Sequence, residues 1–212
     1  MFYAGSFFKV KTIFCQKGDF VCDKKEILLF NQAIGQNIFL LKTKSLAEKI
    51  CKNSPDYKEV LIKKKLPDQL MITIVSRSAF ALLEAGLGKK MVIDEEGYIL
   101  SDGDLTVNLP RVLVRVLPTP GEKISDEKTL QALKLIKLLE GSFLSFKKID
   151  GISKSDLTLF LSQGLIATFS AQKDLVTQVD SLQYILRHSR MEDSKIQAID
   201  LRFQKPVLKF AQ

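Results

Sequence analysis

The sequence predicts an α+β fold divided into two domains, residues 8–77 and 78–212. Short segments with apolar residues at alternate positions, typical of half-buried strands, are interspersed with segments in which apolar residues recur every three or four positions, as in helices. The charge also changes along the chain. Residues 1–77 hold 14 lysines and arginines against 7 aspartates and glutamates, whereas residues 78–212 hold 18 against 17. This asymmetry indicates two parts with different surroundings.

The first domain is expected to begin with a strand and a helix. Residues 8–15 alternate as a strand does, and apolar residues on both sides of the second half predict that both faces are buried there. In residues 22–35 apolar side chains recur at helical spacing, and Asp23 favours the first turn. Gly35 lies where a left-handed C-cap belongs. The pattern predicts one helix over this segment.

A second helix and a hairpin complete the first domain. Ser45 and Glu48 have the spacing of a capping box, which predicts a helix start. Residues 57–77 predict a hairpin with its turn at 66–69, because apolar and polar residues alternate on both sides of a Pro-Asp pair. The order strand, helix, helix, strand, strand predicts a three-stranded sheet with two helices on one face.

The second domain is expected to be a mainly antiparallel β-sheet with flanking helices. Turn residues predict hairpins around 95–97 and 162–164, and residues 108–124 predict one strand followed by a loop rich in proline and glycine. One helix is predicted over 125–140, with Ser125 as its cap and Leu133, Ile136 and Leu139 along one face. Another is predicted over 173–189, because Leu175, Val179, Leu182 and Leu186 recur every three or four residues.

The chain closes on the segment AIDLRFQKPVLKF, residues 198–210. Ile199, Leu201 and Phe203 alternate with polar residues, as in a half-buried strand. Pro206 then removes a backbone donor, and the apolar positions beyond it change parity. The strand is therefore expected to be bulged, to end early or to lie at a sheet edge.

The sequence offers no evident set of residues for catalysis, a cofactor or a metal ion. His188, the single histidine, lies at the end of a predicted helix, where a cation suits the helix dipole. The acidic cluster at 94–96, with Asp102 and Asp104 nearby, lacks the register of a calcium loop and fits turn formation better. We therefore expect a binding or scaffolding protein rather than an enzyme.

The lysines and cysteines of the first domain have plain interpretations. Arg77 is the only arginine there and no aromatic RNA-stacking motif accompanies the lysines, which favours a solvated lysine-rich face over nucleic-acid binding.

The three cysteines of the first domain, Cys15, Cys22 and Cys51, lack the spacing of a zinc site. Cys15 and Cys51 are interpreted as small buried hydrophobic residues, and a Cys15–Cys22 disulfide is an open alternative.

An ordered set of short motifs extends over nearly the whole chain. They are Phe8-x-Val10-x-x-Ile13, Gly35-x-Asn37-Ile38-Phe39, Leu66-Pro67-Asp68, VIDEEGYIL from Val92, Leu109-Pro110 and AIDLRF from Ala198. In this order they resemble the FtsQ family of bacterial cell-division proteins, called DivIB in Gram-positive lineages. Residues 8–77 are similar to its POTRA domain, of order β-α-α-β-β, and residues 78–212 to its β domain. Residues 1–7 would be a residual membrane-proximal segment.

The resemblance implies a non-enzymatic scaffold of the division machinery. Such a protein lies outside the cytoplasmic membrane at the septum, is anchored by one helix before residue 1, and binds FtsB-like and FtsL-like proteins. It helps to localise and regulate septal peptidoglycan synthesis. The basic first domain suggests an additional weak contact with anionic membrane lipids. No nucleic acid, small-molecule substrate or cofactor is expected.

The resemblance also indicates where a partner would bind. In the family, the last strand of the β domain receives a strand from FtsB, an example of β-augmentation. The residues that match by position, together with two helix arginines suited to acidic partner residues, are Arg202, Phe203, Gln204, Lys205, Val207, Phe210, Arg187 and Arg190. For Phe203, packing in the core beside Ile199 and Leu201 is an equal alternative.

Two other functions compete with this prediction. A POTRA-containing chaperone or translocation module, of the outer-membrane assembly or partner-secretion type, would keep the first domain. Those proteins usually carry tandem POTRA domains before a membrane barrel, which the second domain does not resemble. A cell-wall hydrolase is disfavoured by the missing catalytic set.

Overall fold

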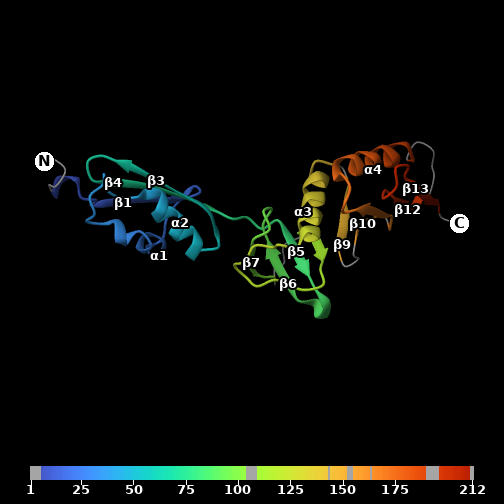
Figure 1. Ribbon diagram of the computed structural model, residues 1–212, viewed down its shortest axis with the longest axis horizontal. Coiled ribbons are helices and arrows are strands. Elements are labelled where there is room, and N and C mark those ends of the chain that lie inside the picture. The colour runs from blue at the N-terminus through green and yellow to red at the C-terminus, as the bar shows by residue number, and fades with distance from the viewer. Residues whose placement is uncertain are drawn as a thin grey trace. The chain divides into compact units, whose positions relative to one another are not determined.

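The computed structural model describes residues 6–103, 109–142, 144–151, 155–162, 164–189 and 196–210. The chain divides into two compact units, Met1–Arg77 and Ser78–Gln212, called here unit 1 and unit 2 (Figure 1). Within the described residues four α-helices accompany two β-sheets, so the predicted α+β class is confirmed.

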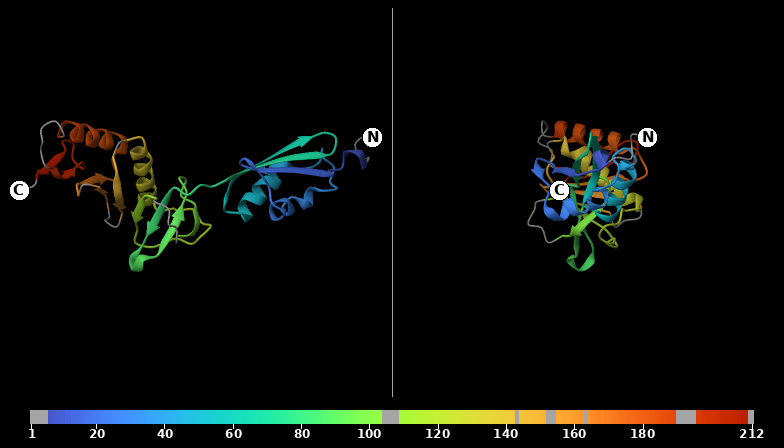
Figure 2. Two further views of the ribbon diagram at one scale, coloured as in Figure 1. Left: turned by 180° about the vertical axis from the view of Figure 1, so that it is seen from behind. Right: turned by 90° about the vertical axis from the view of Figure 1, so that its left-hand side faces the viewer.

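Unit 1 is a four-stranded sheet with its helices on one face (Figures 1 and 2). Its elements are β1 (Thr12–Lys17), β2 (Phe20–Val21), α1 (Lys24–Leu28), α2 (Thr43–Asn53), β3 (Tyr57–Lys65) and β4 (Gln69–Ser76), with 3-10 turns at Ser6–Phe8 and Asn31–Ala33. The strand order is β2-β1-β4-β3. β1 and β4 are parallel, and β3 and β4 form the predicted antiparallel hairpin. The two-residue β2, which was not predicted, extends the expected three-stranded sheet.

The core of unit 1 lies between the sheet and the helices. Leu70, Ile72 and Ile74 of β4 are buried and Met71 is exposed, which confirms the alternation predicted for this strand. Phe14 of β1 lies opposite Met71 and is 52% exposed. The prediction that both faces of β1 are buried is therefore wrong, because the helices cover only one face of the sheet.

The first helix is much shorter than predicted. Asp23 is the N-cap of α1, and its Oδ1 accepts a hydrogen bond from the Glu26 amide at 2.7 Å, with Glu26 completing a capping box. After α1, Phe30 is fully buried, and the Gly35 amide donates to the Val10 carbonyl oxygen. These contacts with the chain before β1 replace further helical turns. Gly35 is left-handed, with φ 79°, as predicted.

The second helix starts before Ser45, the residue predicted to cap it. α2 begins at Thr43, and no side chain caps its N-cap residue, Lys42. The capping-box prediction for Ser45 and Glu48 is therefore wrong, since both residues lie inside the helix. Leu41, immediately before the cap, is buried, so packing rather than a side-chain cap accompanies the start of this helix.

The structure decides between the two interpretations of Cys15, a free buried thiol and a disulfide with Cys22. Cys15 and Cys22 form a disulfide, with Cα atoms 5.3 Å apart, that joins β1 to the residue before the α1 cap. Cys15 is therefore not a free buried thiol. Cys51 is free and half-buried, and burial raises the pKa of its thiol.

Replacing Cys15 and Cys22 together by serine is expected to lower the free energy of unfolding of unit 1 by about 2 kcal/mol, because the short loop they close would gain freedom in the unfolded chain. Amide hydrogen exchange of unit 1 peptides across a urea series measures this. The Cys51→Ser variant is the control, expected to differ from the parent by less than about 1 kcal/mol because Cys51 is half-buried and closes no disulfide. A double variant as stable as the parent protein would contradict the prediction.

Unit 2 is built on one nine-stranded sheet. Its elements are β5 (Ala81–Glu84), β6 (Lys90–Ile93), β7 (Ile99–Asp102), β8 (Arg111–Leu113), α3 (Glu127–Glu140), β9 (Phe146–Asp150), β10 (Asp156–Leu161), β11 (Ile166–Ser170), α4 (Leu175–Ser189), β12 (Ile196–Asp200) and β13 (Val207–Phe210), with a 3-10 turn at Gly86–Gly88. The strand order is β13-β12-β11-β10-β9-β8-β5-β6-β7. The pairs β5–β8, β8–β9 and β11–β12 are parallel, and the other pairs are antiparallel, so the sheet is mainly antiparallel.

Both predicted hairpins of unit 2 are present, as β6–β7 and β10–β11. Helix α3 buries Leu133, Ile136 and Leu139 against the sheet, as its spacing predicted. Its cap differs, however. Asp126 is the N-cap and accepts a hydrogen bond from the Thr129 amide at 2.8 Å, so the choice of Ser125 is wrong by one residue.

The closing segment does not form one strand. β12 ends at Asp200, residues 202–205 form a bend, and β13 folds back antiparallel to β12 with Asp200 opposite Val207. Of the three outcomes that Pro206 allowed, the strand ends early. The strand at the sheet edge is β13, because β12 is paired on both sides with β11 and β13.

Candidate protein-interaction site

The edge strand β13 is the centre of the candidate site. Within the part of the chain that the structure describes, β12 is the only strand that pairs with β13. Val207 and Phe210 are 55% and 50% exposed, while Leu208 packs against the core of unit 2. A strand with one unpaired side presents backbone donors and acceptors to a further strand.

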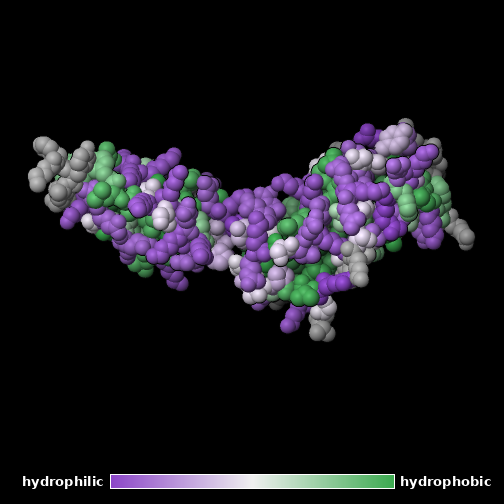
Figure 3. Space-filling view, viewed as in Figure 1, coloured by the Kyte–Doolittle hydropathy of each residue, from purple (hydrophilic) through white to green (hydrophobic). Residues whose placement is uncertain are grey.

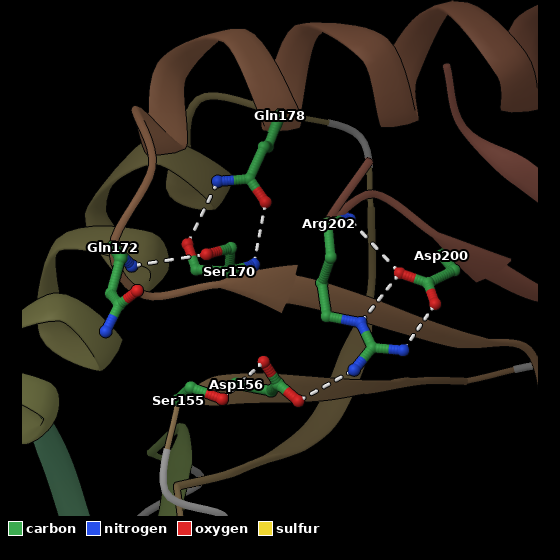
Figure 4. A network of polar contacts seen from close by, with 7 residues as sticks. All are labelled: Ser155, Asp156, Ser170, Gln172, Gln178, Asp200 and Arg202. Atoms are coloured by element: carbon green, nitrogen blue, oxygen red, sulfur yellow. Dashed lines mark hydrogen bonds and ion pairs between the residues drawn. The ribbon is translucent and has the colours of Figure 1, made fainter. Parts of the chain in front are cut away.

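A network of charged groups fixes the bend before this edge (Figure 4). The Arg202 guanidinium forms a bidentate pair with Asp200, with Nε to Oδ1 at 2.9 Å and Nη2 to Oδ2 at 2.6 Å. Its Nη1 donates to Asp156 Oδ2 at 2.9 Å, on the neighbouring hairpin. Lys173 Nζ donates to the Arg202 carbonyl oxygen at 2.6 Å. The bend is thereby tied to β10, to β12 and to the loop before α4.

The electrostatics of this network follow from its geometry. Hydrogen bonds from Arg202 lower the pKa of the Asp200 carboxyl group, and the same pair holds the pKa of Arg202 above its usual value. Opposite charge and hydrogen bonding both favour the ionised forms. At neutral pH Arg202 and Asp200 therefore form a fixed pair of opposite charges, and Arg202 is engaged within unit 2 itself.

Helix α4 is held beside the edge by a buried amide. Gln178 Oε1 accepts a hydrogen bond from the Ser170 amide at 2.8 Å, and its Nε2 donates to the Ser170 carbonyl oxygen at 3.0 Å (Figure 4). This double contact joins α4 to the end of β11. The helix is thus positioned against the sheet next to the closing hairpin.

An open groove of about 530 Å³ lies between α4 and the closing hairpin. Tyr184 and Ile185 line it from α4, and Pro206 and Leu208 line it from the other side. Tyr184 is 65% exposed. The groove therefore offers mainly apolar and aromatic surface beside the backbone edge of β13.

The structure brings most of the predicted partner residues to this region, although not in one strand. Phe203, Gln204 and Lys205 are exposed in the bend, where they cannot take part in the β12 ladder. Core packing of Phe203 is wrong, because its side chain is 57% exposed, with its ring centroid 5.7 Å from Arg202 Cζ.

The two predicted helix arginines have different outcomes. Arg187 is exposed in the last turn of α4, the helix that lines the groove. Arg190 lies outside the described residues.

Sequence reasoning missed the groove residues Tyr184, Ile185 and Leu208. Ile185 packs at the margin of the core and Tyr184 is 65% exposed, so an aromatic residue beside the apolar stripe of α4 was the one available signal. In the sequence, Leu208 is one of the apolar residues that change parity after Pro206. Leu208 lines the groove because the bend at residues 202–205 folds β13 back along β12, and the sequence did not predict that bend.

The other candidate residues of the sequence take structural roles. Asp94 is buried, and its Oδ1 accepts hydrogen bonds from the amides of Glu96 and Tyr98, which confirms turn formation; Asp104 lies outside the described residues. His188 lies in the last turn of α4, where its ring contacts the Tyr184 ring with centroids 4.1 Å apart and ring planes tilted by 34°. In the described part of the chain, no group of three or more histidine, cysteine or acidic side chains is placed to hold a metal ion.

No helix among the described residues has both the length and the apolar character needed to cross a lipid bilayer.

Comparison with known proteins does not identify a family for this chain. The chain matches no family model and no curated protein.

Proposed function

We propose that this protein is a non-enzymatic scaffold of the bacterial division machinery, similar to FtsQ and DivIB, with a POTRA-type unit 1 and a β-type unit 2. In this role it binds FtsB-like and FtsL-like partners and helps to localise and regulate septal peptidoglycan synthesis. The observation that carries the proposal is the single-sided pairing of β13 next to an apolar groove. A partner strand added there would gain backbone hydrogen bonds from the edge and side-chain contacts from the groove.

The architecture of unit 1 supports the proposal. Its order of β1, two helices and the β3–β4 hairpin, with β1 parallel to β4, matches the β-α-α-β-β order expected of a POTRA domain. The short β2 is an addition to that order.

The surroundings of the edge favour an acidic partner with alternating apolar residues. Lys205 and Lys209 are exposed just before and on β13, and Arg187 is exposed on α4, whereas the charged side chain that lines the groove itself is Asp180. Since strand side chains alternate between faces, every second residue of an added strand would point toward the groove side. Acidic residues on the partner would meet Lys205 and Lys209 beside the edge, which chiefly raises the association rate and the selectivity.

The disulfide supports a location outside the cytoplasm. Disulfides such as Cys15–Cys22 persist in oxidising compartments and are rare where glutathione and thioredoxin keep thiols reduced. This agrees with a protein whose two units lie beyond the cytoplasmic membrane, at the division septum.

Titration with the extracytoplasmic segment of an FtsB-like partner tests the proposal. Phe210→Glu is expected to weaken binding about tenfold or more, because it places a charge at the edge strand and next to the partner. Phe14→Glu is the matched control, since Phe14 is exposed to nearly the same extent, 52% against 50%, but lies on the sheet of unit 1. Its affinity should equal that of the parent protein.

Amide hydrogen exchange of the same complex distinguishes strand addition from side-chain docking. Strand addition predicts that amides within residues 207–210 become protected on binding, because their outward N–H groups gain partners. Undiminished affinity in a folded Phe210→Glu variant, without new protection at β13, would remove this site. The absence of any binding to the FtsB-like segment would remove the division role.

A further inference from the structure

One end of unit 1 is formed by three segments that are distant in the sequence. Residues 6–11, 36–44 and 62–69 meet there, and this region is called the lysine pole. The Ile38 amide donates to the Phe8 carbonyl oxygen at 2.9 Å, and the Lys11 amide donates to the Asp68 carbonyl oxygen at 2.9 Å. Lys64 Nζ donates to the Phe39 carbonyl oxygen at 3.2 Å. The three segments therefore form one continuous surface.

The lysine pole carries large apolar side chains that are open to solvent. Phe7, Leu40 and Leu66 are 61%, 79% and 56% exposed, one from each segment. The Phe7 ring contacts Phe8, which in turn contacts Phe39, with centroids 5.1 and 5.2 Å apart. Figure 3 shows apolar surface at this end of unit 1 beside hydrophilic surface. These side chains project from turns and from a hairpin tip, and not from the core.

The positive charge of unit 1 is concentrated at the same pole. The three segments hold seven lysines, all exposed, and one acidic residue, Asp68. Asp68 lies 3.3 Å from Lys11 as an ion pair. With a net charge of +6, the pole accounts for nearly all of the +7 carried by residues 1–77.

We propose that the lysine pole binds the surface of an anionic lipid bilayer. Exposed aromatic and aliphatic side chains partition into the boundary between headgroups and acyl chains, while lysines around them reach the lipid phosphates. Each lysine close to such a surface strengthens binding, and the effect falls off within a Debye length. The exposed apolar side chains Phe7, Leu40 and Leu66 come from three separate segments and have lysines between them. A fluid layer of lipid headgroups can adapt to such a scattered arrangement more readily than the surface of one rigid protein partner.

This binding site is independent of the proposed division role. It depends only on the surface of unit 1, whereas the partner site lies on β13 in unit 2. Failure of one proposal would therefore leave the other unaffected.

Cosedimentation of the full chain with vesicles tests the charge requirement. The protein is expected to bind phosphatidylcholine vesicles containing phosphatidylglycerol, and not vesicles of phosphatidylcholine alone, with binding lost at high salt. Lys63→Gln combined with Lys65→Gln should lower the partition coefficient about 25-fold, from about fivefold for each lysine. Lys64 is kept, because its hydrogen bond holds the Phe39 loop.

The matched control removes two lysines from the opposite end of unit 1. Lys49 and Lys52 are exposed on the second half of α2, which runs away from the pole toward the start of β3. At 1.5 Å per residue, Lys49 and Lys52 lie about 7.5 and 12 Å along the helix beyond Lys44, the last lysine of the pole, compared with a Debye length of about 10 Å at 0.1 M salt, so a bilayer at the pole attracts them much less than it attracts the pole lysines. Lys49→Gln combined with Lys52→Gln should change the partition coefficient by less than about twofold.

Insertion of the apolar tips has its own test. The chain has no tryptophan, so Leu40→Trp introduces a single fluorescent probe at the pole. Its emission is expected to shift to the blue, and to be quenched by brominated lipids, when anionic vesicles are added. Phe20→Trp is the control, because Phe20 is 79% exposed at the other end of β1 and should not respond.

Three results would overturn the proposal. These are a lack of binding to anionic vesicles at low salt, equal losses in the two double lysine variants, and a blue shift at Phe20→Trp as large as that at Leu40→Trp. Retention of the protein on an acidic polypeptide but not on vesicles would replace the lipid surface with an acidic protein partner.

Discussion

Replacing Phe169 by alanine is expected to destabilise unit 2 by about 3–5 kcal/mol, the largest effect of any substitution considered. Phe169 is fully buried on β11, opposite Leu157 of β10, and belongs to the same core as Val179 and Leu182 of α4. Alanine would leave a cavity beside β11, where the paired strands β10 and β12 on both sides limit collapse.

This loss should appear in unit 2 alone. Amide hydrogen exchange of peptides from β10 and β11 across a urea series measures the free energy of unfolding of unit 2, while peptides from β3 and β4 report unit 1 in the same sample. Phe203→Ala is the matched control, since its ring is largely exposed and its loss should cost less than about 1 kcal/mol. Equal destabilisation by both substitutions would mean that Phe169 is not a core residue.

Replacing Arg202 by methionine is expected to destabilise unit 2 by about 2–3 kcal/mol at neutral pH. The variant would lose the bidentate pair with Asp200 and the contact with Asp156, and would leave two partly buried carboxylates unpaired. The value lies below that of a fully buried pair because the Arg202 side chain is 39% exposed and solvent screens its charge. Arg187→Met, on the exposed surface of α4, should change the stability by less than about 0.5 kcal/mol.

The effect of this substitution should depend on pH. Because the pKa of Asp200 is lowered in the folded protein, its contribution is fully present above the unfolded value of about 4 and is lost as the pH falls through the folded pKa. The stability difference between parent and Arg202→Met is therefore expected to shrink in urea series recorded at successively lower pH below about 4. A constant difference down to pH 2 would show that the carboxylates are not responsible.

Loss of the Arg202 network should also weaken partner binding. Arg202 fixes the bend between β12 and β13, so its removal would loosen the hairpin whose outer edge is proposed to accept the partner. A lower affinity of Arg202→Met, together with faster hydrogen exchange in residues 207–210, would indicate this positioning role. Unchanged hydrogen exchange in residues 207–210 would mean that Arg202 contributes to the stability of unit 2 and does not position the edge strand.

Much of the fold was predictable from local patterns. The β3–β4, β6–β7 and β10–β11 hairpins were located correctly, because strand alternation and turn residues such as Gly97 are properties of adjacent residues. The buried stripes of α3 and α4 were located correctly for the same reason. Helix ends were less certain. Ser45 and Ser125 had suitable side chains, but α2 begins before Ser45 without a side-chain cap, and the neighbouring Asp126 caps α3 in place of Ser125.

The candidate site was predictable only in outline. Exposed Val207, Phe210 and Lys205 lie in the segment that the sequence singled out. Arg202 and Phe203 were expected in an edge strand and lie instead in a bend, because Arg202 binds carboxylates from two strands. One of them, Asp156, is 46 residues away in the sequence. No local pattern contains that contact.

The sequence by itself determined the α+β class, the alternation of each hairpin, the concentration of lysines before residue 77 and the break at Pro206. Only the tertiary structure decided that Phe14 is exposed, that Cys15 joins Cys22, that three segments meet at the lysine pole and that β13 forms the edge. The physical reason is the range of the interactions. Periodicity and turn chemistry act between neighbours in the chain, whereas burial, pairing order and charge networks depend on which distant residues share a surface.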